Sequence, residues 1–337
     1  MVAVTGAADG LGRALVERLA GRGELAGLIG LDLAPVGLLG VSSRTADPRG
    51  PFPKAALDGV TTVVHLATSF DAAEPAVSRR ALNVGGTARL LRAAERVGAR
   101  VVLVTSADVW GARADNPVPL PDAAPLRAEP DPQTLAGDHA EVERLAAAAG
   151  VPVTVLRPAA LVGGNLGPAY DGVLLRQLQA ARLLAVRGYE PQWQLCHADD
   201  LLAALVLAAL GRVGGALGVG GDGALPQSRV EQLSGRRRLE LPAGVAASTA
   251  ERLQRLGLTT GSPRELDHLL GPLVVAADGL RAGGWRPVWS NEDALAAHLA
   301  ARSGDSRTAA YTAAGATVAL LGSAALVRRA RRRRRLL

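Results

Sequence analysis

The sequence predicts an α/β protein in which helices cover both faces of a doubly wound parallel sheet. Apolar runs alternate with stretches of helical periodicity through the first half of the chain, which is the pattern of parallel strands joined by helices. A glycine-rich turn connects the first run to the first helix. After Pro158 the runs shorten and proline and glycine become frequent, so we expect a small C-terminal lobe. The predicted strands are residues 2–4, 28–32, 61–67, 100–106 and 151–157.

The first strand leads directly into a turn that carries Gly6, Gly10 and Gly12. Glycine lets the backbone approach a ligand closely, and the first turn of a helix presents free N–H groups and a positive dipole end. A diphosphate fits such a turn. Asp32 ends the next strand, 20 residues after Gly12, where a dinucleotide-binding fold places the carboxylate for the adenosine ribose. These features predict a Rossmann domain; the alternative is a purely structural turn in another α/β protein.

Acidic residues near this turn favour NAD over NADP as the cofactor. Asp32 would accept hydrogen bonds from the ribose hydroxyls and repel a 2′-phosphate, and Asp9 adds negative charge in the turn. We therefore expect NAD to bind here.

Helical periodicity predicts the elements between and after the strands. We expect helices at residues 11–19, 78–97, 133–149, 172–185, 199–210, 227–234, 247–256 and 291–302, and a proline-rich loop over 107–132. The expected organisation is a NAD-binding Rossmann domain at 1–157, the remaining Rossmann elements and a substrate lobe at 158–302, a linker at 303–307, an apolar membrane-directed helix at 308–327 and a polyarginine tail at 328–337.

Composition narrows the classes of partner. The net charge of +7 equals the number of arginines among the last ten residues, Arg328, Arg329 and Arg331 to Arg335, so the body of the chain is neutral. A nucleic-acid-binding body would carry its own basic face, and we expect none. The single cysteine, Cys196, forms no internal disulfide and is expected to be a buried apolar residue. We expect no metal site, because no Cys/His cluster has ligand spacing, and no secretory signal, because the chain enters its first strand at once.

Seven short motifs occur in an order that resembles the extended short-chain dehydrogenase/reductase family, in its NAD-dependent epimerase/dehydratase branch. They cover about residues 1–302. The motifs are Thr5-Gly6-Ala-Ala-Asp-Gly10-Leu-Gly12, His65-Leu66-Ala67-Thr68, Asn83-Val84-Gly85-Gly86-Thr87, Thr105-Ser106-Ala-Asp-Val109-Trp110-Gly111, Leu156-Arg157-Pro158, His197-Ala-Asp199-Asp200 and Gly284-Trp285-Arg286-Pro287. The resemblance implies that NAD is bound by Gly6, Asp9, Gly10, Leu11, Gly12, Asp32, Asp47, Leu66, Ala67, Ser106 and Pro158.

The chain departs from the family at the catalytic pair. Family catalysis depends on Tyr-x-x-x-Lys on the helix after the proline-rich loop, in which tyrosine is the acid/base and lysine lowers its pKa. Alignment places Leu135 at the tyrosine position and His139 at the lysine position. The chain's three tyrosines, Tyr170, Tyr189 and Tyr311, and its one lysine, Lys54, do not form the motif.

Other side chains could carry out proton transfer at this place. Ser106 offers a hydroxyl, and His139 has a suitable pKa range for an acid/base; the alternative for His139 is a helix-surface residue in a cleft that no longer turns over. Asp138 points to a different helix face, so we do not expect it to orient His139. We expect His65 to be structural at a strand end, and we expect His197 and Asp200 to cap a helix.

The C-terminal segment predicts a membrane contact. Residues 308–327 contain no charge over 20 positions, the length that crosses a bilayer, but threonine, serine and glycine make the stretch only weakly apolar. We expect a helix on the cytoplasmic leaflet with arginines on anionic lipid. A true membrane span, and a soluble helix whose arginine tail binds nucleic acid or a partner, stay open as alternatives.

Two classes of function follow. The first is a NAD-binding protein with absent or atypical catalysis, serving as a sensor or scaffold at the membrane surface. The second is an active NAD-dependent oxidoreductase, epimerase or dehydratase that uses Ser106 and His139 on a sugar-nucleotide or lipid-like substrate. Family members often pair through the helices after the fourth and fifth strands, so the resemblance also implies a homodimer. We expect a cytoplasmic protein at the inner face of the cell membrane.

Overall fold

The computed structural model describes residues 1–163, 166, 170, 172–179, 182–242 and 271–302. Residues Met1–Leu295 form one compact unit. Ala296–Leu337 form a second unit, of which residues 296–302 are described and helical. The predicted helix at 247–256 and the linker, apolar helix and arginine tail after residue 302 lie outside the described residues.

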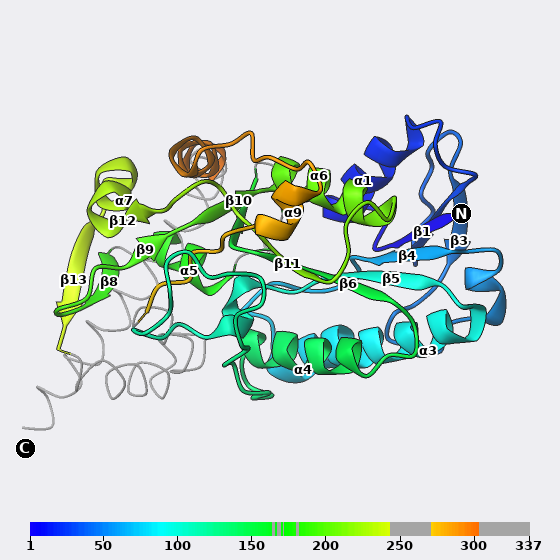
Figure 1. Ribbon diagram of the computed structural model, residues 1–337, viewed down its shortest axis with the longest axis horizontal. Helices are drawn as coiled ribbons and strands as arrows, with labels where there is room; N and C mark the ends of the chain where they lie inside the picture. Colours follow the sequence, from blue (N-terminus) through cyan, green and yellow to red (C-terminus); the bar gives the residue numbers. More distant parts are fainter. Residues whose placement is uncertain (164–165, 167–169, 171, 180–181, 243–270, 303–337) are drawn as a thin grey trace, which may run out of the picture. The chain divides into compact units, whose positions relative to one another are not determined.

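A seven-stranded, all-parallel sheet forms the centre of the first unit (Figure 1). The strand order is β11-β6-β5-β4-β1-β2-β3, so the order reverses at β1, where dinucleotide-binding folds place their ligand. This confirms the predicted Rossmann fold. The strands are β1 Val2–Thr5, β2 Leu28–Asp32, β3 Ser42–Thr45, β4 Thr62–His65, β5 Arg100–Val104, β6 Val153–Pro158 and β11 Ala216–Val219.

Helices cover both faces of this sheet, and each face has its own apolar core. The α3 and α4 helices lie on one side and α1, α6 and α9 on the other (Figure 1). Alternate residues of one strand enter opposite cores: Val102 packs toward α1 and α6, and Val101 toward α3 and α4. The helices are α1 Gly10–Ala20, α2 Ala76–Arg80, α3 Thr87–Val97, α4 Leu135–Ala147, α6 Ala198–Ala209 and α9 Asp278–Ala282, and residues 291–302 are also helical.

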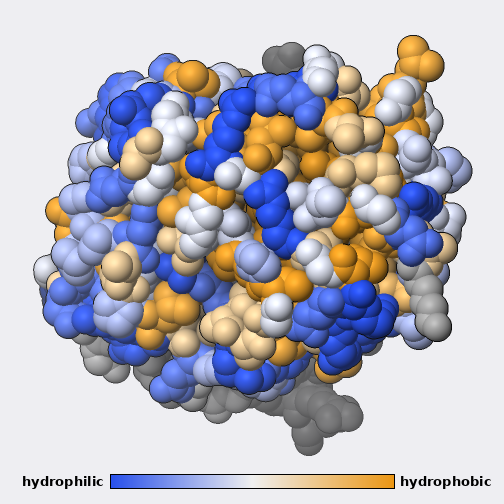
Figure 2. All heavy atoms as spheres, turned by 45° about the vertical axis from the view of Figure 1, so that its right-hand side comes forward, coloured by the Kyte–Doolittle hydropathy of each residue, from blue (hydrophilic) through white to orange (hydrophobic). Residues whose placement is uncertain are grey.

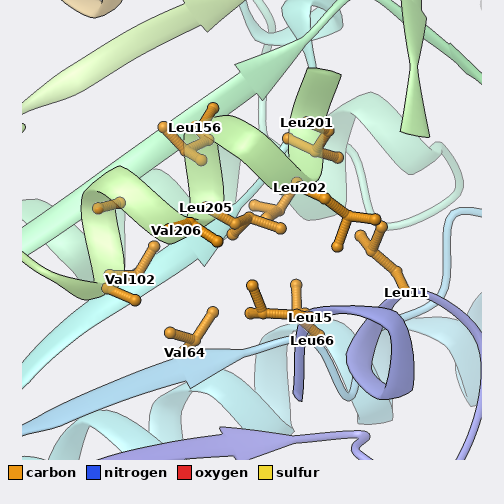
Figure 3. Packing of buried hydrophobic residues seen from close by; sticks show 14 of the residues in the cluster. Leu11, Leu15, Val64, Leu66, Val102, Leu156, Leu201, Leu202, Leu205 and Val206 are labelled. Atoms are coloured by element: carbon orange, nitrogen blue, oxygen red, sulfur yellow. The ribbon is translucent and has the colours of Figure 1, made fainter. Parts of the chain in front are cut away.

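The packing of α1 against α6 and the sheet holds the nucleotide turn in place. Figure 3 shows Leu11 and Leu15 of α1 facing Leu202 and Leu205 of α6, with Val64 of β4 beneath. All of these side chains are buried. The start of α1 is therefore held against α6 and the sheet.

The predicted helix at 78–97 begins slightly earlier and contains a π-helical segment. The α2 helix runs into the π-helix Ala81–Gly86 and then into α3. Asn83 lies in this segment; its amide bonds both the N–H and the C=O of Ser69, each at 2.8 Å. π-Helical turns often occur at functional sites. Here the wider turn brings Asn83 to the loop that follows β4.

The lobe after β6 contains short strand pairs and helices. Its elements are β7 Ala160–Val162, β10 Leu195–His197, β9 Gln192–Trp193, β12 Leu225–Pro226, β8 Arg182–Val186, β13 Arg237–Leu241, α5 Val173–Arg176 and α7 Gln227–Ser234. The prediction of one helix over 172–185 is wrong. The helical part ends at Gln179, and β8 follows because its backbone pairs in parallel with β13.

Among the described residues, no helix is both long and apolar enough to span a bilayer. Hydrophilic and hydrophobic residues are interspersed over the face seen in Figure 2. The predicted membrane contact depends on residues after 302, so it stays a prediction.

Candidate functional site

The turn between β1 and α1 can be formed only by small residues. Gly6 has a φ of +67°, and a Cβ atom there would lie 2.9 Å from the backbone nitrogen of Ala67. A Cβ on Gly12 would lie 1.9 Å from the carbonyl oxygen of Gly6. Both contacts are with backbone, which cannot rotate away. The glycines therefore let the start of α1 pack directly on the ends of β1 and β4.

Asp32 is held at the end of β2 by two backbone donors. Its carboxylate accepts hydrogen bonds from the N–H of Ala8 at 3.1 Å and the N–H of Ala34 at 3.2 Å. The first of these connects it to the nucleotide turn. The carboxylate is only half-buried, so its remaining lone pairs can accept from a ligand.

A cavity of about 480 Å³ opens over this turn. It brings together six of the predicted cofactor residues: Gly6, Asp9, Gly10, Asp32, Leu66 and Ala67. Leu11 and Gly12 lie behind it in the first turn of α1. Asp47 does not line the cavity; its carboxylate accepts from the N–H of Arg49 at 2.8 Å, and Arg49 itself is a lining residue.

Tyr170, to which the sequence motifs assign no role, reaches the same cavity from the lobe. Its hydroxyl accepts a hydrogen bond from the N–H of Leu11 at 3.4 Å, and its ring stacks on Phe70 with 5.7 Å between centroids. Burial raises the pKa of this hydroxyl. Its position on the turn depends on the fold of the lobe, so no local sequence signal marks it.

A second cavity, of about 60 Å³, continues past Tyr170 toward the predicted catalytic residues and is named here the active-site cavity. It brings Ser106, His139 and Pro158 together, as predicted. Leu135 lines it too, at the first position of α4 and almost fully buried. Most of its other walls are apolar: Phe70, Ala159, Leu161, Leu174, Leu175 and Leu273.

His139 is buried, so the alternative of a helix-surface histidine is wrong. Only 3% of the residue is exposed, because Phe70 covers its ring at 5.3 Å between centroids. Burial, together with the nearby Arg79 guanidinium, lowers the pKa of His139 to about 3. The imidazole is therefore neutral near pH 7, and it can donate or accept a hydrogen bond but is a weak base.

Asp138 does not orient His139, in agreement with the prediction. Its carboxylate bonds the guanidinium groups of Arg79, at 2.8 Å, and Arg80, at 3.1 Å. Burial raises the pKa of Asp138, although both arginines act in the opposite direction. This buried cluster joins α2 to the first turn of α4.

Ser106 caps the short 3-10 turn Ala107–Trp110, where its hydroxyl oxygen accepts from the N–H of Asp108 at 3.2 Å. Asp108 also lines the active-site cavity, and burial raises the pKa of its carboxyl. Asp108 lies in the motif Thr105–Gly111, and no role was predicted for it. A charged residue directly after a strand end was the available signal.

A buried ion pair fixes α4 against the sheet behind these side chains. Arg157 of β6 bonds both carboxylate oxygens of Glu143, at 2.8 and 2.6 Å, and Thr105 donates to the same carboxylate at 2.8 Å. The Arg157 guanidinium also lies 4.8 Å above the ring of Trp110. The arrangement connects β5, β6, α4 and the turn after Ser106.

Comparison with known proteins identifies the family. Residues 2–219 match the NAD dependent epimerase/dehydratase family. The uncharacterized protein Rv0501 of Mycobacterium tuberculosis is 31% identical over 314 residues, which cover 88% of this chain and 82% of the relative. The chain belongs to the NAD-dependent epimerase/dehydratase family.

Two further proteins are similar to this chain in sequence or in fold. A 3-diazoavenalumate denitrifying reductase of Streptomyces is 30% identical over 238 residues, 68% of this chain and 78% of the relative. The Bordetella bronchiseptica enzyme WbmG, solved in complex with NAD and UDP, has the same fold: its TM-score is 0.63 at 19% identity, over 90% of this chain and 94% of that one. It and several other structural neighbours were crystallised with NAD.

The residues of the larger cavity fit the cofactor of this family. Asp32 supplies a carboxylate for ribose hydroxyls, and the glycine turn presents backbone N–H groups where a diphosphate would lie. Pro158 and Ser106 line the adjoining cavity, where the resemblance places the nicotinamide.

His65, His197 and Cys196 have structural surroundings. His65 is buried at the end of β4, 2.7 Å from the hydroxyl of Thr5. His197 caps α6, with Nδ1 accepting from the N–H of Asp199. Asp200 does not cap the helix, contrary to the prediction; its carboxylate accepts from the N–H groups of Val288 and Trp289 instead. Cys196 is fully buried, as predicted, and no metal-binding group occurs among the described residues.

Proposed function

We propose that the protein binds NAD at the β1–α1 turn and lacks the tyrosine-dependent proton transfer of its family. The observation that carries this proposal is the position of Leu135. Its side chain is buried at the start of α4 and lines the active-site cavity beside Ser106, where the family alignment requires the tyrosine. An aliphatic side chain can neither take nor give a proton.

Two other titratable groups of the cavity, His139 and Tyr170, support the same proposal. The pKa of His139 is lowered to about 3, far below the operating pH at which a general base is effective. Tyr170 lines the cavity too, but burial raises its pKa, whereas a catalytic tyrosine needs a lowered one. Loss of a positioned general base typically reduces a rate by about 10²–10⁴-fold.

Binding of NAD does not depend on those groups. When bound, NAD supplies hydride-transfer chemistry. The chain's own contribution is to hold its ribose through Asp32, to present the N–H groups of the glycine turn to its diphosphate, and to exclude water with the apolar walls of the active-site cavity.

Isothermal titration of the purified protein with NAD and a turnover assay on the same sample test the proposal. We expect one NAD per chain, tighter than NADP, and no measurable turnover of sugar nucleotides or hydroxysteroids. Absence of NAD binding would contradict the binding part, and rapid turnover would contradict the catalytic part.

A second candidate is an active NAD-dependent oxidoreductase. It is supported by the convergence of Ser106, Asp108 and His139 on one cavity, and by the reductase among the relatives. The apolar walls would suit a small aromatic or lipid-like substrate. If turnover is found, Ser106→Ala and His139→Ala should each reduce kcat while NAD still binds; activity indifferent to both changes would place the reaction elsewhere.

We also propose that the C-terminal arginine tail contacts anionic membrane. The proposal rests on the sequence alone: 20 uncharged residues followed by seven arginines. Full-length protein should sediment with anionic vesicles and be released by salt, while a chain ending at Arg302 should stay in solution. Equal behaviour of both chains would remove the proposal, and release by detergent alone would indicate a membrane span.

A further inference from the structure

Behind the active-site cavity lies a second, much smaller cavity of about 10 Å³, between the end of β4 and helix α4. Three polar atoms of its lining residues are buried without a protein partner: Nε2 of His65, Oγ1 of Thr68 and Nδ1 of His139. The other polar side chains around it, Asn83 and Thr87, have hydrogen bonds. A cavity with this concentration of unpaired polar atoms requires an explanation, because each such atom costs about 1–3 kcal/mol if it stays unpaired.

The position of the proton on His65 follows from its neighbours. The hydroxyl oxygen of Thr5 accepts from the backbone N–H groups of Leu66 and Ala67, both at 3.1 Å, and lies 2.7 Å from Nδ1 of His65. Because both acceptor sites of that oxygen are used, the hydroxyl donates its own proton to Nδ1. Burial lowers the pKa of His65 to about 4, so the ring is neutral near pH 7. Its proton is therefore on Nε2, the atom without a protein partner.

We propose that the cavity binds one water molecule, which accepts a hydrogen bond from Nε2–H of His65 and donates one to Nδ1 of His139. The hydroxyl of Thr68 is its third partner. One water needs about 10–15 Å³ and two to four polar partners; the cavity of about 10 Å³ lies at the lower end of that range, and three unpaired polar atoms belong to its lining residues. A metal ion does not suit the site, since it would need the lone pair of a nitrogen that carries a proton.

The water sets the proton position on the second histidine. If Nδ1 of His139 accepts from the water, the neutral ring carries its proton on Nε2. The same ring lines the active-site cavity, so it presents an N–H donor there rather than a base. His65 is thus a positioning residue for His139 that acts through the water. This last consequence rests on the proposed function, whereas the water site itself does not.

A crystal structure at high resolution and ¹⁵N NMR of the histidine rings, both on protein without added NAD, test the proposal. We expect a density peak within about 3.2 Å of the three atoms, and both rings with the proton on Nε2. The Nδ1 resonance of His139 should be shifted upfield as a hydrogen-bond acceptor. Absence of the peak, or a proton on Nδ1 of His139, would overturn the proposal, whatever NAD does in a separate titration.

Two matched variants sharpen the test. Thr68→Val replaces the hydroxyl with a larger methyl group, so the peak should be lost and the upfield shift of His139 Nδ1 should disappear. Thr68→Ser keeps the hydroxyl and should keep both. An unchanged Nδ1 shift in folded Thr68→Val would overturn the role of the water in positioning His139, because a purely structural threonine would not affect that resonance.

Discussion

The nucleotide end of the site, at the β1–α1 turn, and the end at the active-site cavity differ in how well their residues match the family's motifs. At the nucleotide end, six of the nine residues predicted there line one cavity, and the glycines that the turn needs are all present. At the other end, Ser106 caps its turn and Arg157 holds α4 against the sheet, while Leu135 and His139 stand at the positions that the resemblance assigns to the catalytic tyrosine and lysine. Under the proposed function, binding and proton transfer depend on separate segments, so one can be lost without the other.

Restoring the family pair tests this separation with the largest expected effect. Leu135→Tyr combined with His139→Lys would supply an acid/base and the cation that lowers its pKa, which is worth about 10²–10⁴-fold in rate. We expect NADH formation from an accepted alcohol to rise by that factor, with NAD affinity little changed. Leu135→Phe with His139→Lys is the control that lacks only the hydroxyl. Equal activity of the two variants would show that the geometry is lost as well as the chemistry.

At the nucleotide end, Gly12→Ala should largely abolish NAD binding. The new Cβ would meet the carbonyl oxygen of Gly6 at 1.9 Å, so the start of α1 must shift away from the diphosphate. Loss of two hydrogen bonds to a charged group weakens binding by about 100-fold or more. Calorimetry and thermal unfolding would measure the change. Gly21→Ala has open space around its Cβ and should bind normally; weak binding by that control would mean that α1 tolerates no change at all.

Asp32→Asn should have a smaller and more specific effect. The amide keeps the shape but loses the negative charge, and its NH2 faces one of the two backbone N–H groups that the carboxylate accepts from, so NAD should bind at least about 10-fold more weakly. The affinity for NADP should rise relative to that for NAD. Arg49 lines the same cavity, and the Asp32 carboxylate would no longer offset its attraction for the 2′-phosphate. Asp58→Asn, at an exposed residue that does not line the cavity, is the control. Tighter binding of NADP than NAD by unmodified protein would contradict the assigned role of Asp32.

The stability of the protein should decrease as the pH falls below about 6.5. Burial lowers the pKa of His65 to about 4 and that of His139 to about 3, whereas both titrate near 6.5 when unfolded. The unfolded chain therefore binds protons that the native chain does not, at a cost of up to about 1.4 kcal/mol per pH unit for each ring.

The carboxyls of Asp108 and Asp138 make the protein more stable as the pH falls, because burial raises their pKa values in the native state. Comparing His139→Gln with unmodified protein isolates the histidine. Urea unfolding at pH 5 and pH 7 should show a smaller loss of stability in the variant. An identical loss in both proteins would mean that His139 is protonated in the native state.

Tyr170→Phe should produce the smallest effect. The hydroxyl accepts a hydrogen bond from the N–H of Leu11, and a bound diphosphate would compete for the same donor. Removal of the hydroxyl should therefore tighten NAD binding by about 5-fold. Tyr189→Phe should leave the affinity unchanged, since Tyr189 lines neither cavity. Weaker binding after Tyr170→Phe would indicate that the hydroxyl contacts the cofactor directly.

The elements that could be predicted are those whose own sequence determines them. Alternating buried strands and the glycine turn carry local patterns, so the Rossmann fold, five of the seven strands of the sheet and α1 were predicted correctly. The β3 strand, Ser42–Thr45, is short, polar and mostly exposed, and pairing with β2 is what makes it a strand. The sequence of β8 alone predicts a helix, and its backbone pairing with β13 makes it a strand.

Side-chain surroundings were less predictable for the same reason. The burial of His139 comes from Phe70, which lies 69 positions earlier in the chain. The contact of Tyr170 with Leu11 joins residues 159 positions apart. The spacing of apolar residues along the chain does not predict contacts over such distances in sequence.

The hydroxyl of Thr5 has a consequence for the dynamics of the cleft. It accepts the amide protons of Leu66 and Ala67 after the last residue of β4. Those two amides should therefore exchange with deuterium as slowly as the interior of the sheet, although they border an open cavity. The floor of the nucleotide cavity is then set before any ligand arrives.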